Sequence, residues 1–319
     1  MTTIAHEIRL IAGERYAGHW PVEHLGKFMA ELPPALRSCV SMAFSHRGKS
    51  IGRRPGWLER AADVRWNSRR QTQPDTLILE LPPLGECAAE LYRQQTLDSE
   101  FDDRPAKDDT ALDLLGDVLS DVALKNADSD RFDHDLLGRI AKFGSVFKNG
   151  PFQELLVTSR RFPSDRPFRL TSGTAVCAKE LLGRTPVPQR VRLVGELDGI
   201  VASTQRFSLL LDTGEHAMGV FAVENSEALR SLWQKRVVVC GMAIYRPSGR
   251  LLRVDAESIE AGDGESSLFS RLPSPPIATL DHQTLRQTQG PRSGVNALIG
   301  NWPGDETDEE IEALLERFS

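Results

Sequence analysis

Hydrophobic positions follow a mixture of helical and strand periods in the first 190 residues of the chain. Residues 108–126 place Leu112, Leu115, Leu119 and Val122 on one face, which predicts an amphipathic helix. The same kind of reading predicts further helices over residues 22–31, 34–44, 133–147 and 174–182. Apolar or alternating runs predict strands over 4–11, 76–81 and within 151–171. This mixture predicts an α+β body at the N-terminus.

The segment that follows, residues 190–259, shows five short strand-like runs separated by turn residues. The predicted order is strand, strand, strand, short helix, strand, strand, over residues 191–201, 207–212, 215–222, 226–234, 237–245 and 251–259. Asp212-Thr213-Gly214 is a tight hairpin turn, and Pro247-Ser248-Gly249 joins the last two strands. Five strands with a helix between the third and fourth is the order of an OB-fold barrel. We therefore expect an OB-like β-barrel.

Composition divides the chain further. Gly, Ser, Pro and Gln cluster between residues 261 and 300, which predicts a linker. The predicted fold class is α+β, with a mixed N-terminal body, a five-stranded OB-like barrel and a tethered C-terminal helix. The expected segments are an α+β unit, a helical and mixed segment, the barrel, the linker and an acidic tail helix, over residues 1–104, 105–189, 190–260, 261–300 and 301–319.

The tail, residues 301–319, has the pattern of a short acidic amphipathic helix. Thr307 and Glu310 fit a capping box, which satisfies free amides at a helix start. Trp302 precedes a Pro-Gly turn and offers an aromatic anchor. One apolar stripe is formed by Ile311, Leu314, Leu315 and Phe318. A one-stripe helix of this length is marginal alone, so we expect it to need a groove on this protein or on another.

Charge is distributed unevenly along the chain. The formal net charge of −6 resides in the tail, which holds seven Asp or Glu and one base, Arg317. Within the neutral remainder, residues 37–70 are rich in Lys and Arg, and residues 97–135 are rich in Asp and Glu. Two interpretations remain open. The two segments face each other or are solvated surfaces, or the basic one is a nucleic-acid patch.

The sequence shows no catalytic constellation, and we expect neither a metal nor another cofactor. The seven histidines lack metal-ligand spacing. Residues 43–50 match a relaxed phosphate-loop pattern, but Gly52 and Pro55 interrupt the helix that such a loop would open. An acidic row at positions i, i+4 and i+8 could chelate a divalent cation or form a solvated face; it consists of Asp113, Asp117 and Asp121.

The cysteine spacing and the length of the apolar runs predict the compartment and the absence of a membrane span. The four cysteines are far apart in apolar surroundings, which predicts reduced thiols in a cytoplasmic protein. No apolar run approaches the ~18 residues needed to span a membrane. We therefore expect a cytoplasmic protein with no membrane contact.

The predicted barrel offers one candidate binding surface. OB-fold barrels bind ligands with the loops that join strands one to two and four to five. Arg206 ends the first of these loops, and Tyr245, Arg246 and Arg250 bound the second. Arginines beside an aromatic ring suit a nucleic-acid strand, because guanidinium binds phosphate and the ring stacks on a base. A structural or protein-docking barrel is the alternative.

The tail also carries a resemblance. Gly-x-Trp-Pro-Gly-Asp-Glu-Thr-Asp-Glu-Glu-Ile, starting at Gly300 and followed by Leu314, Leu315 and a terminal Ser319, resembles the C-terminal peptide of antitoxins paired with PIN-domain toxins. The resemblance implies a toxin-neutralising segment and a metal-dependent ribonuclease as partner. The partner-binding residues that follow are Trp302, Ile311, Leu314, Leu315, Arg317 and Phe318.

The leading hypothesis is therefore a non-enzymatic, antitoxin-like binding protein that captures a PIN-domain nuclease with its tail. The alternative is a nucleic-acid-binding accessory protein that uses the barrel loops and the basic segment 37–70. An enzyme of unrecognised type is a third, weaker possibility.

Overall fold

The computed structural model describes the chain, with short gaps, as far as Pro275. The residues described are 2–16, 19–49, 54–71, 73–93, 104–201, 204–221, 226–262 and 269–275. The predicted tail helix, 301–319, and most of the predicted linker lie outside the described residues. The α+β class and the closed five-stranded barrel are both confirmed.

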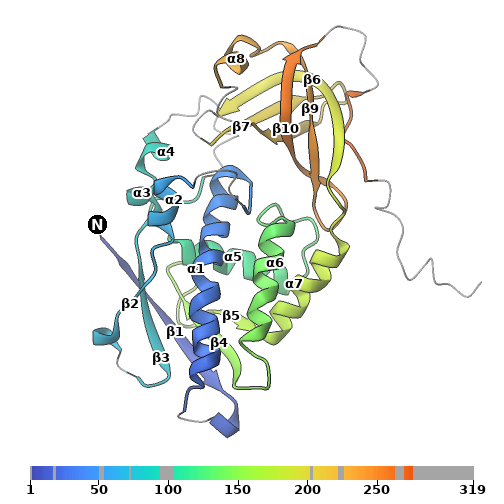
Figure 1. Ribbon diagram of the computed structural model, residues 1–319. Coiled ribbons are helices and arrows are strands. Elements are labelled where there is room, and N and C mark those ends of the chain that lie inside the picture. The colour runs from blue at the N-terminus through green and yellow to red at the C-terminus, as the bar shows by residue number, and fades with distance from the viewer. Residues whose placement is uncertain are drawn as a thin grey trace, which may run out of the picture. The chain divides into compact units, whose positions relative to one another are not determined.

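The N-terminal body is built on one antiparallel sheet of five strands in the order β2-β3-β1-β4-β5 (Figure 1). Their bounds are β1 Ile4–Ala12, β2 Arg65–Trp66, β3 Thr76–Leu81, β4 Phe152–Thr158 and β5 Phe168–Thr171. The central strand β1 pairs with β3 on one side and with β4 on the other. Segments before and after residue 104 therefore complete the same sheet.

Helices pack on this sheet and share its hydrophobic core (Figure 1). The helices are α1 Val22–Ser45, α2 Gly56–Ala61, α3 Leu84–Cys87, α4 Ala89–Arg93, α5 Ala111–Ala123, α6 His134–Lys142 and α7 Ser172–Arg184. Short 3₁₀ turns lie at η1 Glu14–Tyr16, η2 Ser68–Arg70 and η4 Phe143–Ser145. Alternate residues of β1, Ile8 and Leu10, are buried in this core, as the strand period of two requires.

One helix boundary was predicted wrongly. The sequence predicted two helices, over residues 22–31 and 34–44, but α1 runs through Pro33 and Pro34 without a break. Proline inside a helix removes a backbone hydrogen bond and costs ~3 kcal/mol. Burial overrides that cost, because Phe28 before the pair and Leu36 after it both pack in the same core.

The barrel follows α7 and has the order that the sequence predicted. Its strands are β6 Gln189–Val201, β7 Arg206–Leu210, β8 His216–Val220, β9 Arg236–Tyr245 and β10 Leu251–Ala261, and helix α8 Ser226–Ser231 lies between β8 and β9. The sheet closes in the order β10-β8-β7-β6-β9. The pair β8–β10 is parallel and the other pairs are antiparallel. This closed barrel is compatible with an OB-like fold.

The barrel encloses its own apolar core. The burial of β9 alternates strictly along its ten residues, so that Val237 and Val239 face inward. Phe207 of β7 packs in the same cluster and lies 6.5 Å from the ring of Phe221. No described helix is long and apolar enough to cross a membrane.

Candidate functional site

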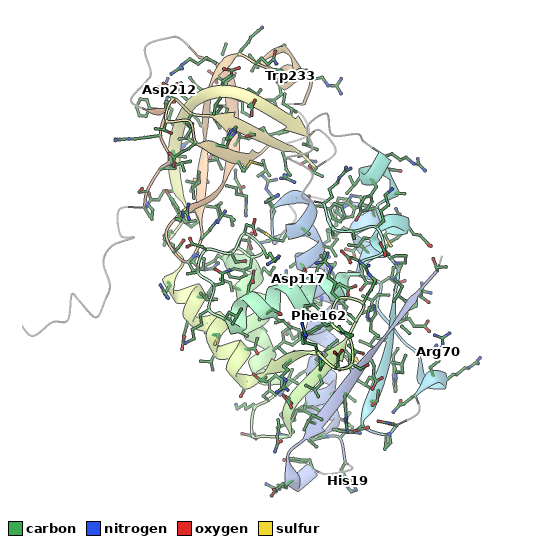
Figure 2. All side chains as sticks on the ribbon, turned by 180° about the vertical axis from the view of Figure 1, so that it is seen from behind. His19, Arg70, Asp117, Phe162, Asp212 and Trp233 are labelled. Carbon is green, nitrogen blue, oxygen red and sulfur yellow. The ribbon has the colours of Figure 1, made fainter. Side chains whose placement is uncertain are left out.

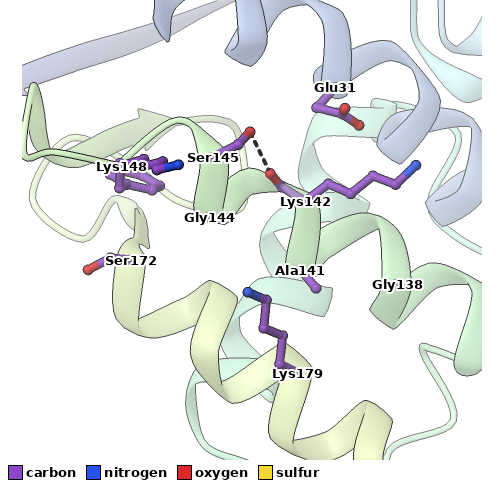
Figure 3. A pocket seen from close by; sticks show the side chains of 10 residues that line it. Glu31, Gly138, Ala141, Lys142, Gly144, Ser145, Lys148, Ser172 and Lys179 are labelled. Carbon is purple, nitrogen blue, oxygen red and sulfur yellow. Dashed lines mark hydrogen bonds between the residues drawn. The ribbon is translucent and has the colours of Figure 1, made fainter.

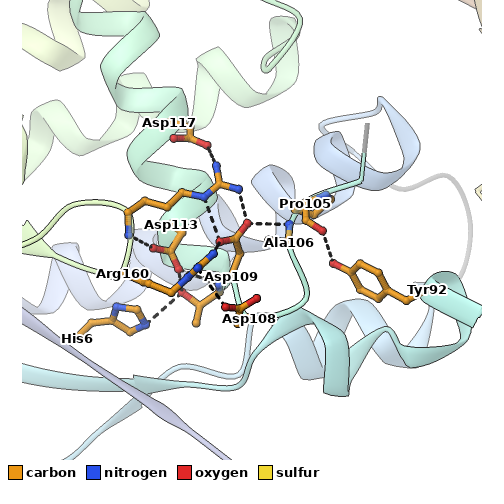
Figure 4. Close-up of polar contacts among 11 residues, drawn as sticks. His6, Tyr92, Pro105, Ala106, Asp108, Asp109, Asp113, Asp117 and Arg160 are labelled. Atoms are coloured by element: carbon orange, nitrogen blue, oxygen red, sulfur yellow. Dashed lines mark hydrogen bonds and ion pairs between the residues drawn. The ribbon is translucent and has the colours of Figure 1, made fainter. Parts of the chain in front are cut away.

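The acidic row of α5 lies inside an ion-pair network (Figure 4). Asp113 is buried at the start of the helix, and its carboxylate accepts hydrogen bonds from the Thr110 amide at 2.8 Å and the Arg161 amide at 3.1 Å. Burial alone would raise the pKa of Asp113, but the Ser159 side chain together with the Thr110 and Arg161 amides outweighs burial and holds that pKa below its ordinary value. Asp113 therefore stays ionised and fixes the first turn of α5.

Arginines pair with the other two carboxylates of this row and with the neighbouring Asp109. Arg161 pairs with Asp117 and with the fully buried Asp109, and Arg160 also pairs with Asp109. Asp121, one turn further along α5, pairs with Arg131 at 2.9 Å. Among the described residues, no group of His, Cys, Asp or Glu is placed to hold a metal ion. Neither a cation site nor a solvated face describes this row, because Asp113 is buried and accepts backbone amides, and arginines of the chain pair with Asp117 and Asp121.

His6 links the sheet to this network. Its Nε2 lies 3.1 Å from the Thr110 hydroxyl, so β1 is joined to the start of α5 (Figure 4). Burial lowers the pKa of His6 more than the charge of Asp113 raises it. The imidazole is therefore neutral at pH 7 and serves as a buried connection.

The segment that matched a phosphate loop has a different geometry. It begins in the last turn of α1, whose C-cap His46 adopts the left-handed conformation (φ 52°), and it does not follow a strand. The amide of Gly48 donates to Asp133 at 2.8 Å, and the Arg47 side chain pairs with Asp255 at 3.5 Å. This loop is used to join the body to the barrel, which disfavours the phosphate-loop interpretation.

The second predicted barrel loop also contacts the body. The Arg246 guanidinium donates to the Asp128 carbonyl at 2.7 Å, and the Ser248 amide donates to the Ala127 carbonyl at 3.1 Å. Arg250 lies 3.9 Å from the Asp128 carboxylate, yet its side chain is 75% exposed. The loop between β9 and β10 therefore has an intramolecular neighbour at the position where an OB-fold ligand would lie.

The two remaining barrel candidates are buried. Tyr245 is 1% exposed, and burial raises the pKa of its hydroxyl. Arg206 at the start of β7 is 6% exposed. In this conformation neither the Tyr245 ring nor the Arg206 guanidinium lies open to a nucleic-acid strand.

A shallow groove between α6 and α7 gathers basic side chains (Figure 3). It has a volume of about 810 Å³, and three lysines lie on its rim, Lys142, Lys148 and Lys179. Glu31 of α1 is its acidic lining residue. All three lysines are exposed. The groove can attract anions, but it buries no polar group that would define a specific ligand.

The basic segment 37–70 and the acidic segment 97–135 form most of their ion pairs with other residues and not with each other. The basic segment 37–70 pairs with Glu59, Asp63, Glu80 and the barrel residue Asp255. The acidic segment 97–135 pairs with arginines that lie in β10, in the loop after β4 and in its own second half. The contact of Gly48 with Asp133 is a hydrogen bond that does join them.

Comparison with known proteins identifies no relative of this chain. No protein-family model, curated protein or solved structure matches this chain. The interpretation of function therefore depends on the residues themselves.

The predicted capture residues lie outside the described part of the chain. These are Trp302, Ile311, Leu314, Leu315, Arg317 and Phe318. The ion pairs of Asp109, by contrast, are seen in the structure and were not predicted from the sequence. Sequence analysis missed Arg160 and Arg161 as its partners, because they are more than fifty positions away and only the folding of β4 beside β1 brings them to α5.

Proposed function

We propose that the protein is a non-enzymatic binding protein of the antitoxin type, and that its tail captures a PIN-domain ribonuclease. The observation that supports this is the composition of residues 301–319. A capping box, one apolar stripe and seven acids lie within nineteen residues. The rest of the chain has equal numbers of acidic and basic residues, so the net negative charge lies in the tail. This charge would attract the tail to a basic surface of a partner.

The mechanism is a helix that binds in a groove. Trp302 and the stripe from Ile311 to Phe318 would fill an apolar groove of the nuclease. Arg317 is the one base of the tail and would reach the acidic, metal-binding centre that the resemblance implies. The acids of the tail would pair with the basic rim that binds RNA or compete for the metal.

Features of the described body are consistent with a scaffold for such a tail. Two carboxylates of α5, those of Asp117 and Asp121, are paired with arginines of the same chain, so they are not free to act on a basic partner. The body and the barrel are joined by the buried pair Arg253–Asp133 at 3.1 Å. A body held together in this way can keep its fold when the tail binds.

The experiment is calorimetry with a co-expressed PIN-domain ribonuclease, and a PIN-domain reading frame beside this gene would be the first candidate to use. Replacing Leu314 and Phe318 with Ala should weaken binding by roughly 2–4 kcal/mol for each anchor. Leu124→Ala is the matched control, because Leu124 is an exposed leucine at the end of α5 and should leave affinity unchanged. Unchanged affinity after removal of residues 301–319 would refute tail capture.

The second candidate is a nucleic-acid-binding protein with an OB-like barrel. The closed strand order and the exposed Arg250 favour it. The intramolecular contacts of Arg246 and Ser248 and the burial of Tyr245 favour the first candidate, since they occupy the loop that such a ligand requires.

A further inference from the structure

Three lysines surround the shallow groove between α6 and α7, and none of them forms an ion pair with a described residue. They are Lys142 at the end of α6, Lys148 in the loop after η4 and Lys179 of α7. Lys125 is different, because its ammonium group pairs with Glu180 of α7 at 2.6 Å. Positive charges that gather without a partner repel one another and favour an anionic ligand.

Small and apolar residues line the groove between these lysines (Figure 3). Gly138 and Ala141 belong to α6, and Gly144 lies in η4. A Cβ added at Gly138 would meet nothing within 4 Å, so the surface of α6 is open at this point. The described lining has three lysines against one glutamate, Glu31 of α1, and therefore a net charge of +2. A basic rim around an apolar surface fits an acidic amphipathic helix.

We propose that this groove binds the acidic tail of the same chain, residues 301–319. The predicted tail helix has the matching chemistry: one apolar stripe, seven Asp or Glu and a single base, Arg317. The stripe packs on the small residues of α6 and η4, and the acids pair with the three lysines. Charge complementarity supports this ligand, because the tail carries the net negative charge of the chain and the groove carries unpaired positive charge.

The size of the groove agrees with the size of the stripe. The groove has a volume of about 810 Å³. Two turns of an α-helix with a diameter of 10 Å occupy roughly 850 Å³. The stripe from Ile311 to Phe318 spans eight residues, which is about two turns. The apolar part of the tail therefore has the length that the groove accommodates.

The connection to the tail is long enough for this contact. Residues 276–300 separate Pro275 from the tail, and 25 residues reach roughly 85 Å when fully extended. A folded chain of 275 residues has a radius of gyration of roughly 19 Å, so a path over half of its surface is roughly 75 Å. The length of the connection thus permits the tail to reach any part of the surface of residues 1–275.

Docking of the tail would regulate the capture of a partner. The docking itself does not rest on the proposed function, but this consequence does. The same stripe cannot pack on the groove and on a nuclease, so only the undocked fraction of tails captures the partner. If about one tail in ten is undocked, the apparent affinity for the nuclease falls about tenfold. Exposed ion pairs contribute little free energy, so a tightly binding nuclease can displace the tail from the groove.

The test is amide hydrogen exchange of the full chain without a partner, read by mass spectrometry over residues 308–318. We expect these amides to be protected in the wild type. Reversing the three groove charges together should speed their exchange by about tenfold or more, because it removes the docked state. Raising the salt from about 50 mM to about 500 mM should have the same effect, since it screens exposed charge pairs. The groove variant carries Lys142→Glu, Lys148→Glu and Lys179→Glu.

The matched control reverses three exposed charges outside the groove and so has the same net charge as the groove variant. It carries Arg69→Glu, Arg166→Glu and Lys235→Glu. Arg69 adjoins Arg70 in η2, and Lys235 lies two residues after Trp233 of the barrel segment (Figure 2). Protection over 308–318 should persist in this control. Thermal unfolding of both variants verifies that the body remains folded.

A substitution of opposite sign should strengthen docking. Glu31→Lys adds a fourth base to the lining, so exchange over 308–318 should become slower than in the wild type. Calorimetry then examines the regulation. The groove variant should bind a PIN-domain ribonuclease more tightly than the wild type does, with an affinity that approaches that of a synthetic peptide of residues 301–319.

Two results would overturn the docking proposal. One is exchange over 308–318 in the wild type at the rate of an unstructured peptide. The other is an equal loss of protection in the groove variant and in its matched control, which would place the tail elsewhere. A nuclease that binds neither the chain nor the peptide would rule out tail capture, whereas the exchange experiment decides docking by itself.

Discussion

Arg253 of β10 and Asp133, the N-cap of α6, form an ion pair at 3.1 Å with exposed fractions of 6% and 3%. The same carboxylate accepts the Gly48 amide at 2.8 Å and the Leu136 amide at 3.0 Å. One aspartate therefore holds the start of a helix, the loop after α1 and the barrel. Its placement makes the folding of the barrel and of the body depend on each other.

Arg253→Ala should lower the free energy of unfolding by about 3–5 kcal/mol. The substitution leaves Asp133 buried without its cation, and a lone buried charge is far more costly than the pair. Urea denaturation followed by circular dichroism measures the effect. Arg190→Ala is the control, because Arg190 forms an exposed pair with Glu257 at 2.6 Å that should contribute about 1 kcal/mol or less. Equal effects of the two substitutions would contradict a structural role for the buried pair.

Two helix glycines should respond to alanine in opposite directions. A Cβ at Gly116 of α5 would lie 2.4 Å from the Phe162 ring and 2.7 Å from the Phe168 ring, whereas a Cβ at Gly138 of α6 meets nothing within 4 Å. Gly116→Ala should destabilise the protein by roughly 1–3 kcal/mol through overpacking. Gly138→Ala should stabilise it by roughly 0.4–1 kcal/mol, because alanine favours the helix. Thermal unfolding of both variants checks the pair, and a stable Gly116→Ala protein would show that the aromatic pair can move.

Stability should fall as the pH is lowered below about 6.5, in part because of His6. Burial lowers the pKa of His6 in the folded state, while the unfolded chain keeps a value near 6.5. Between the two pKa values the unfolded state binds more protons, so acid favours unfolding. His6→Gln should reduce the change in unfolding free energy between pH 8 and pH 5. An identical pH dependence in the variant would show that His6 does not contribute.

The order of elements followed from the sequence because local patterns determine it. The apolar run over residues 237–245 and the turn at Pro247-Ser248-Gly249 predicted the last two barrel strands to within two residues at each end. The continuity of α1 through Pro33 and Pro34 could not be predicted, because burial against residues distant in sequence decides it. The ion pair of Arg161 with Asp117 could not be predicted either, because the two residues are distant in sequence and come together only in the folded protein. The exposure of Trp66 is likewise a property of the edge position of β2.

The barrel loop between β9 and β10 makes a testable prediction for nucleic acid. If the loop between β9 and β10 is engaged with the body, Arg246→Ala with Arg250→Ala should leave the affinity for single strands and its salt slope unchanged. The same double substitution should lower the free energy of unfolding by about 0.5–1.5 kcal/mol, because it removes the hydrogen bond from Arg246 to the Asp128 carbonyl.

Anisotropy across a salt series and urea denaturation measure the two effects on one preparation. A slope that falls by about 0.7 for each arginine would assign phosphate contacts to the barrel loop instead. The guanidinium has five N–H donors and gives one of them to the Asp128 carbonyl, so Arg246 would then contact phosphate through its remaining donors.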